Sequence, residues 1–161
     1  STQPKAEFTG NLVMDRPADT EPTYLIAGGL VFVPLSAEYL SSWGKDWQRT
    51  APFRLVFCNK QKPEKAQSSL VVLSLVLPDF YNIGYQERNA QNLVLDRANG
   101  QRIDTLESLA TALKSPGDGF HVFEFKKGSA LQKIILDAEQ LDEANQRIAK
   151  RYGVARLQKL K

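Results

Sequence analysis

Residues 24–35 read YLIAGGLVFVPL, an apolar run that Gly28 and Gly29 interrupt. The run is rich in β-branched and aromatic side chains, which is typical of a buried strand. A pair of glycines inside such a strand indicates a bulge, or a place where a ligand approaches the backbone closely. We therefore expect one strand here, with a special backbone geometry at its glycines.

Further strand patterns follow along the chain, at residues 53–57, 69–77, 93–98, 120–126 and 131–136. The segment SLVVLSLVL at 69–77 is almost continuously apolar, so we expect it to be buried on both faces. Asn99-Gly100 is a tight-turn signal. The last two strands flank Gly128-Ser129, which predicts a hairpin.

Three helices are expected between and after these strands: residues 37–43, residues 106–114, and a last helix capped by Asp137 that runs to about Tyr152. Thr105 is the expected N-cap of the second helix. The pattern predicts an α+β fold, a small partly open β-barrel or sheet capped by helices. We expect an extended lead-in at 1–22 and a single domain at 23–161.

Composition sets limits on the class of protein. The chain has 161 residues, 42% hydrophobic and 24% charged, with a net charge of +3, which suits one folded domain and does not by itself imply nucleic acid. We expect no membrane span, because no apolar run approaches about 18 residues. The N-terminal segment STQPKAEFTG lacks signal-peptide features and an initiator Met, so we interpret the chain as a mature form or an excised piece.

Residues suited to catalysis are scarce. The one histidine, His121, lies in a predicted strand, and the one cysteine, Cys58, ends another, so both are interpreted as structural. No G-x-S-x-G elbow, metal-ligand set or nucleotide-binding loop occurs, which predicts no catalytic residues, no metal and no cofactor. Asp104 and Glu107 are expected at a helix N-terminus on dipole grounds. An enzyme that uses carboxylates alone remains an alternative.

The C-terminal part of the chain is basic. Its residues are Arg147, Lys150, Arg151, Arg156, Lys159 and Lys161. We interpret them as a solvated helix face and tail, since no aromatic residues are interleaved to stack bases. A nucleic-acid-binding surface is the alternative interpretation, but we expect no nucleic-acid partner.

A candidate binding site combines a glycine turn, a strand edge and a helix stripe. Strand addition beside a helix is how several domains bind extended peptides. The helix stripe follows an i, i+3, i+4, i+7 spacing. The candidate peptide-binding residues are Gly28, Gly29, Leu30, Val31, Phe32, Val33, Leu106, Leu109, Ala110 and Leu113. The alternative is that both elements are simply core.

The same residues carry a family resemblance. GLVF at 29–32 resembles the GLGF-type carboxylate-binding loop of PDZ domains. More broadly, residues 24–157 resemble the C-terminal PDZ-like domain of Deg/HtrA (Do-like) serine proteases. The matching segments are GGLVFVPLSAEYL at 28–40, VVLSLVLPDFYNIGY at 71–85 and ANGQRIDTLESLATAL at 98–113.

The resemblance implies a protease context. In that family a separate chymotrypsin-like domain carries the catalytic triad, and this chain has no segment like GNSGGP. The resemblance implies a non-catalytic regulatory or assembly module that binds protein segments by strand addition, with other protomers of the same protease among its partners. The alternative is a substrate-capturing PDZ domain that recognises C-termini or extended peptides. A bacterial origin would imply the periplasm or cell envelope; the sequence leaves the compartment open.

Overall fold

The computed structural model describes residues 23–36, 40–51, 70–86, 90–126, 129 and 131–160. The lead-in expected at 1–22, the strand expected at 53–57 and Cys58 lie outside these residues. Of the helix expected at 37–43, the described part contains the short 3-10 helix η1 (Ser41–Trp43). The statements that follow concern the described residues.

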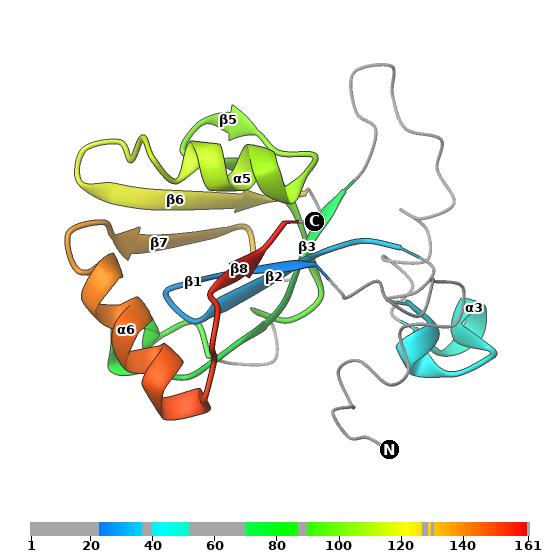
Figure 1. The fold of residues 1–161 in the computed structure, drawn as a ribbon. Coiled ribbons are helices and arrows are strands. Elements are labelled where there is room, and N and C mark those ends of the chain that lie inside the picture. The colour runs from blue at the N-terminus through cyan, green and yellow to red at the C-terminus, as the bar shows by residue number, and fades with distance from the viewer. Residues whose placement is uncertain are drawn as a thin grey trace.

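Eight strands form one antiparallel sheet, which confirms the predicted α+β class. They are β1 (Tyr24–Ala27), β2 (Leu30–Pro34), β3 (Val71–Val76), β4 (Leu93–Ala98), β5 (Gln101–Arg102), β6 (Phe120–Phe125), β7 (Lys133–Asp137) and β8 (Gln158–Lys159). The order is β7-β6-β4-β3-β2-β1-β8, with β5 beside β4. Figure 1 shows β8 running alongside β1, so the last and first described strands are neighbours.

The segment at 24–35 is two strands, and the prediction of one glycine-interrupted strand is wrong. Gly28 and Gly29 have φ values of 60° and 92°, and Ala27 pairs with Leu30 across them. Two consecutive residues with positive φ make the two-residue turn that suits the twist of a hairpin. The expected close approach is made by the chain itself, since an added Cβ would lie 2.6 Å from Tyr81 Cε2 at Gly28 and 2.5 Å from the Leu77 carbonyl oxygen at Gly29.

The helices are α3 (Trp47–Thr50), α5 (Leu106–Ala112) and α6 (Leu141–Tyr152), with a 3-10 turn η2 (Phe80–Asn82). Thr105 caps α5 as predicted, its hydroxyl accepting from the Ser108 N–H at 3.0 Å. The predicted start of α6 is wrong, because Asp137 is the last residue of β7 and its carboxylate accepts from the Glu139 N–H at 2.9 Å.

Two apolar clusters lie on opposite faces of the sheet, as the alternation of side chains along a strand requires. One cluster contains Leu25, Leu30 and Phe32 and the buried face of α5. The other contains Ile26, Val31 and Val33, and the η1–α3 segment packs against it. β1 and β2 are therefore buried on both faces.

Candidate functional site

Strand β2 has neighbours on both sides. β1 pairs with it through Leu25↔Phe32 and Ile26↔Val31, and β3 pairs with its other edge. The prediction that Leu30 to Val33 offer an unpaired edge is therefore wrong for this conformation. The chain adds its own strand at the place where we expected a peptide.

Helix α5 packs against both β1 and β2. Leu25 and Ala27 of β1 share an apolar cluster with Leu106 and Leu109. We call the β2 edge together with the face of α5 toward it the β2–α5 site. β1 occupies this site in the structure.

The ten predicted binding residues divide into three groups. Those in the apolar cluster beneath α5 are Leu30, Phe32, Leu106 and Leu109, with Ala110 and Leu113 partly buried at its margin. Val31 and Val33 face the opposite cluster. Gly28 and Gly29 form the turn between β1 and β2. Their role in binding stays a prediction.

The Gly28–Gly29 turn is enclosed by side chains from distant parts of the chain. The Gly28 N–H donates to Asn145 Oδ1 at 2.7 Å, and the Gly28 carbonyl accepts from Asn82 Nδ2 at 2.8 Å. A Cβ atom added at Gly28 would lie 2.6 Å from Cε2 of Tyr81. Two amide side chains therefore satisfy both backbone polar groups of Gly28, including the N–H that an anion-binding loop would present to a ligand.

Asn82 is the buried centre of this enclosure, with no exposed surface. Its Nδ2 also donates to the Leu77 carbonyl at 2.9 Å, and its Oδ1 accepts from the Asp79 N–H at 3.1 Å and from Gln86 Nε2 at 2.7 Å. These are the bonds that a buried amide needs to offset its desolvation. Sequence reasoning missed Asn82, although Asp79-x-x-Asn82 matches the spacing of a capping box.

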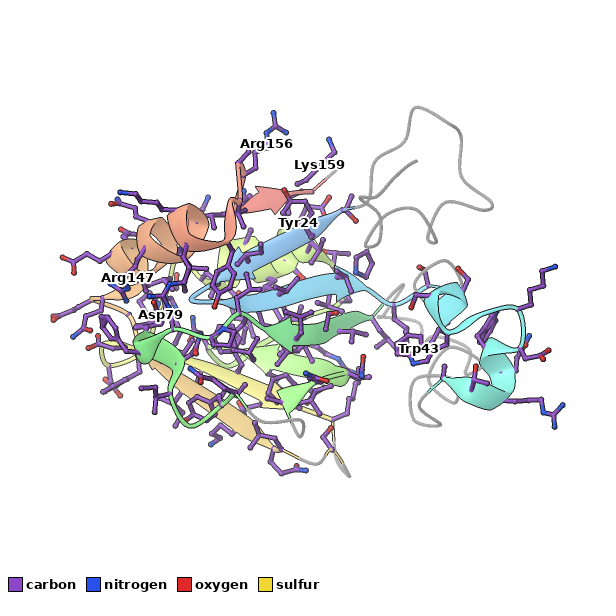
Figure 2. All side chains as sticks on the ribbon, turned by 90° about the horizontal axis from the view of Figure 1, so that it is seen from below. Tyr24, Trp43, Asp79, Arg147, Arg156 and Lys159 are labelled. Carbon is purple, nitrogen blue, oxygen red and sulfur yellow. The ribbon has the colours of Figure 1, made fainter. Side chains whose placement is uncertain are left out.

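An ion pair joins α6 to η2. Arg147 donates to both carboxylate oxygens of Asp79, at 2.9 and 2.7 Å, and its guanidinium lies 3.9 Å from the centre of the Phe80 ring. The bonds from Arg147 hold the pKa of the Asp79 carboxyl below its usual value, against the opposing effect of burial. Figure 2 shows the two side chains meeting, with Arg156 and Lys159 pointing away from the sheet. Arg147 therefore has a structural role within the basic C-terminal group.

Two tyrosines connect η2 and the residues after it to the outer strand β7. The Tyr81 hydroxyl donates to the Asp137 carbonyl, and burial raises the pKa of Tyr81 to about 12. The Tyr85 hydroxyl accepts from the Ile135 N–H at 3.4 Å. η2 and the residues after it, which enclose the Gly28–Gly29 turn, are thereby bonded to the sheet as well as to α6.

His121 belongs to a different network. Its Nδ1 lies 3.0 Å from Asn99 Nδ2, and burial lowers the pKa of the imidazole. Asn99 also donates to the Ala112 carbonyl at 2.9 Å and accepts from the Val122 N–H at 2.8 Å. These contacts connect the β4–β5 turn to β6 and to the end of α5, which is a structural role.

Among the residues whose placement is described, no three His, Cys, Asp or Glu side chains gather as a metal site would require. In the same ranges no helix is long and apolar enough to cross a membrane.

Comparison with known proteins identifies the family. A family model described as PDZ domain matches residues 13–158. "Protease Do-like 2, chloroplastic" of Arabidopsis thaliana is 30% identical over 135 residues, which are 83% of this chain and 21% of that protein. "Protease Do-like 4, mitochondrial" of the same plant is 26% identical over 148 residues, 84% of this chain and 25% of that protein. The chain thus spans about a quarter or less of the curated relatives it matches. It belongs to the PDZ domain family and is related to the Do-like proteases through that domain.

Proposed function

We propose that the chain is a non-catalytic regulatory or assembly module of a Deg/HtrA-type serine protease, and that its β2–α5 site binds protein segments by strand addition. The observation that carries this proposal is the position of β1, which pairs along β2 and packs under α5. A site that holds the chain's own strand is unavailable to passing peptides. This favours regulation over substrate capture.

The competition between β1 and a free peptide is unequal. β1 is joined to β2 by two residues, so its effective concentration at the site is on the order of millimolar or higher. A free peptide must exceed that value or bind more tightly than β1. The site is therefore accessible to segments held nearby, such as those of another protomer, before it is accessible to dilute substrates.

A charge placed beside the site tests the proposal. Ala110 is partly buried at the margin of the apolar cluster, so Ala110→Glu should fold while weakening contacts made there. Light scattering would measure assembly of the chain and of the variant, with Thr111→Glu, an exposed neighbour on the same helix, as the control. We expect Ala110→Glu to reduce assembly and the control to leave it unchanged.

Two results would contradict the proposal. A folded Ala110→Glu variant that assembles as the parent does would refute the site. Ready binding of free C-terminal peptides by the wild-type chain would instead favour the alternative, a substrate-capturing PDZ domain.

A further inference from the structure

If the β2–α5 site binds segments by strand addition, as proposed above, then β1, which occupies the site, shows which kind of segment it binds. β1 directs Leu25 and Ala27 into the apolar cluster with α5, and Ile26 into the cluster on the other face. Leu25 and Ala27 are each 2% exposed. The site therefore holds one large and one small apolar residue, two positions apart.

The end of the site leaves no room for a side chain at the position after Ala27. An added Cβ at Gly28 would lie 2.6 Å from Tyr81 Cε2 and 3.2 Å from Leu136 Cδ1. Tyr81 is itself held by its bond to the Asp137 carbonyl. A ligand side chain at the position after the small residue would therefore have to displace a fixed aromatic ring.

Asn145 determines what may follow the small residue. In β1 the next group is the Gly28 N–H, which donates to Asn145 Oδ1 at 2.7 Å. A ligand that ended at this position would place a carboxylate oxygen where that N–H lies. Asp142 stands in the first turn of α6, three residues before Asn145 and so on the same face of the helix, and it disfavours an added negative charge there. Arg147, the cation nearest in sequence on α6, is engaged by Asp79.

We propose that the β2–α5 site selects extended internal segments, with a large aliphatic residue and a small residue two positions apart and a peptide N–H after them, in preference to free carboxyl termini. Asn145 is the residue that makes this selection. The ligand class is a chain segment that passes through the site and continues.

The test uses the full chain with β1 loosened by Leu25→Ala, and fluorescently labelled peptides. The first peptide is TYLIAGG with an amidated end, the sequence of residues 23–29. The second ends at the alanine with a free carboxylate, and the third carries Asp in place of the leucine. We expect the first peptide to bind about tenfold or more tightly than either of the others.

Location and folding have their own controls. Binding of the first peptide should shift the NMR amide signals of Leu30 to Pro34. If Leu25→Ala does not fold, Tyr24→Ala loosens the strand from its other end, where the Tyr24 hydroxyl donates to the Arg156 carbonyl at 3.0 Å. Equal binding of the leucine and aspartate peptides would overturn the pattern.

The role of Asn145 is read from a ratio of affinities. Asn145→Leu removes the acceptor, so the preference for the continuing peptide over the free acid should fall to about one. Asn145→Asp keeps an acceptor and should keep or increase the preference. Gln146→Leu, on the exposed neighbour, should leave it unchanged.

Failure of the inference and of the proposed function can be told apart. Preference for the free-acid peptide, or a ratio that Asn145→Leu does not change, would overturn the inference while leaving a segment-binding site in place. No binding of any peptide by either folded loosened variant would overturn both.

Discussion

The Gly28–Gly29 turn and the Asn99–Gly100 turn follow the same local rule in opposite surroundings. Both are two-residue turns with positive φ, 60° and 92° in the first and 51° and 80° in the second. Added Cβ atoms would collide with neighbours at Gly28 and Gly29, whereas nothing lies within 4 Å of one at Gly100. The residues of each turn determine its backbone geometry, and the residues packed around it determine whether it is enclosed or open.

The two turns are also held differently. Asn82 and Asn145 reach the first turn from positions 54 and 117 residues away in the chain. The second turn is held by its own Asn99, whose partners lie 13 to 23 residues away. The first turn therefore depends on the docking of η2 and α6. The second depends on Asn99 and on its near neighbour Arg97, which donates to the Gly100 carbonyl at 3.3 Å.

The largest effect should come from filling the enclosed turn. Gly29→Ala would place a Cβ 2.5 Å from the Leu77 carbonyl oxygen, at φ +92°. Backbone strain and overpacking together should lower the free energy of unfolding by about 3 kcal/mol or more. Gly100→Ala, the matched change in the open turn, should cost about 1 kcal/mol. Urea denaturation measures both, and equal losses would contradict the comparison.

The next effect concerns the side chain that holds the open turn. Asn99→Ala removes bonds to Ala112, His121 and Val122, and should lower the free energy of unfolding by about 2 kcal/mol. Asn99→Asp keeps the acceptor for the Val122 N–H and should lose less. Chemical denaturation of the three proteins provides the measurement; an alanine variant as stable as the parent would show that the network contributes nothing.

A smaller effect is expected from a β-branched residue in the open turn. Gly100→Val should lower the free energy of unfolding by about 1 kcal/mol, because β-branched residues resist positive φ. Gly100→Asn, which tolerates that region, is the control. Thermal unfolding that is unchanged in the valine variant would argue against the turn geometry.

The smallest expected effect is a difference in the pH at which each turn loses stability. Because burial lowers the folded-state pKa of His121, the unfolded state binds more protons as pH falls below about 6.5, and stability decreases there. Asp79, near the other turn, has a lowered folded-state pKa because Arg147 donates to its carboxylate. Its contribution to stability is therefore lost only as pH falls below the ordinary aspartate pKa of 3.8 and through the lowered folded-state pKa. Melting temperatures measured from neutral to acidic pH test whether the loss of stability due to His121 precedes the loss due to Asp79. A loss of stability near neutral pH that persists in His121→Leu would contradict this order.

Much of the fold could be predicted, because strand and helix patterns are local. The strand expected at 69–77, the Asn99–Gly100 turn and the Thr105 cap each depend on a few adjacent residues. The structure has the strand as β3, Val71–Val76, and confirms the turn and the cap. The start of α6 was wrong because Asp137 has the chemistry of an N-cap while tertiary pairing keeps it in β7.

The candidate site was harder to predict, because its features are not local. Apolar residues at 30–33 are compatible with both a free edge and a paired one, and only the fold shows that β1 takes the edge. Asn145 lies in an amphipathic helix where an amide is expected on the solvent side. Its bond to Gly28 spans 117 residues, so no local pattern could indicate it.

Amide hydrogen exchange of the wild-type chain most directly tests whether β1 occupies the β2–α5 site. The Ile26 N–H donates to the Leu157 carbonyl on the β8 side, so the alternating N–H groups of Leu25 and Ala27 face β2. The account predicts that these two amides exchange as slowly as those of β3. Exchange as fast as that of the exposed Gly100 amide would contradict it, because the site would then be open.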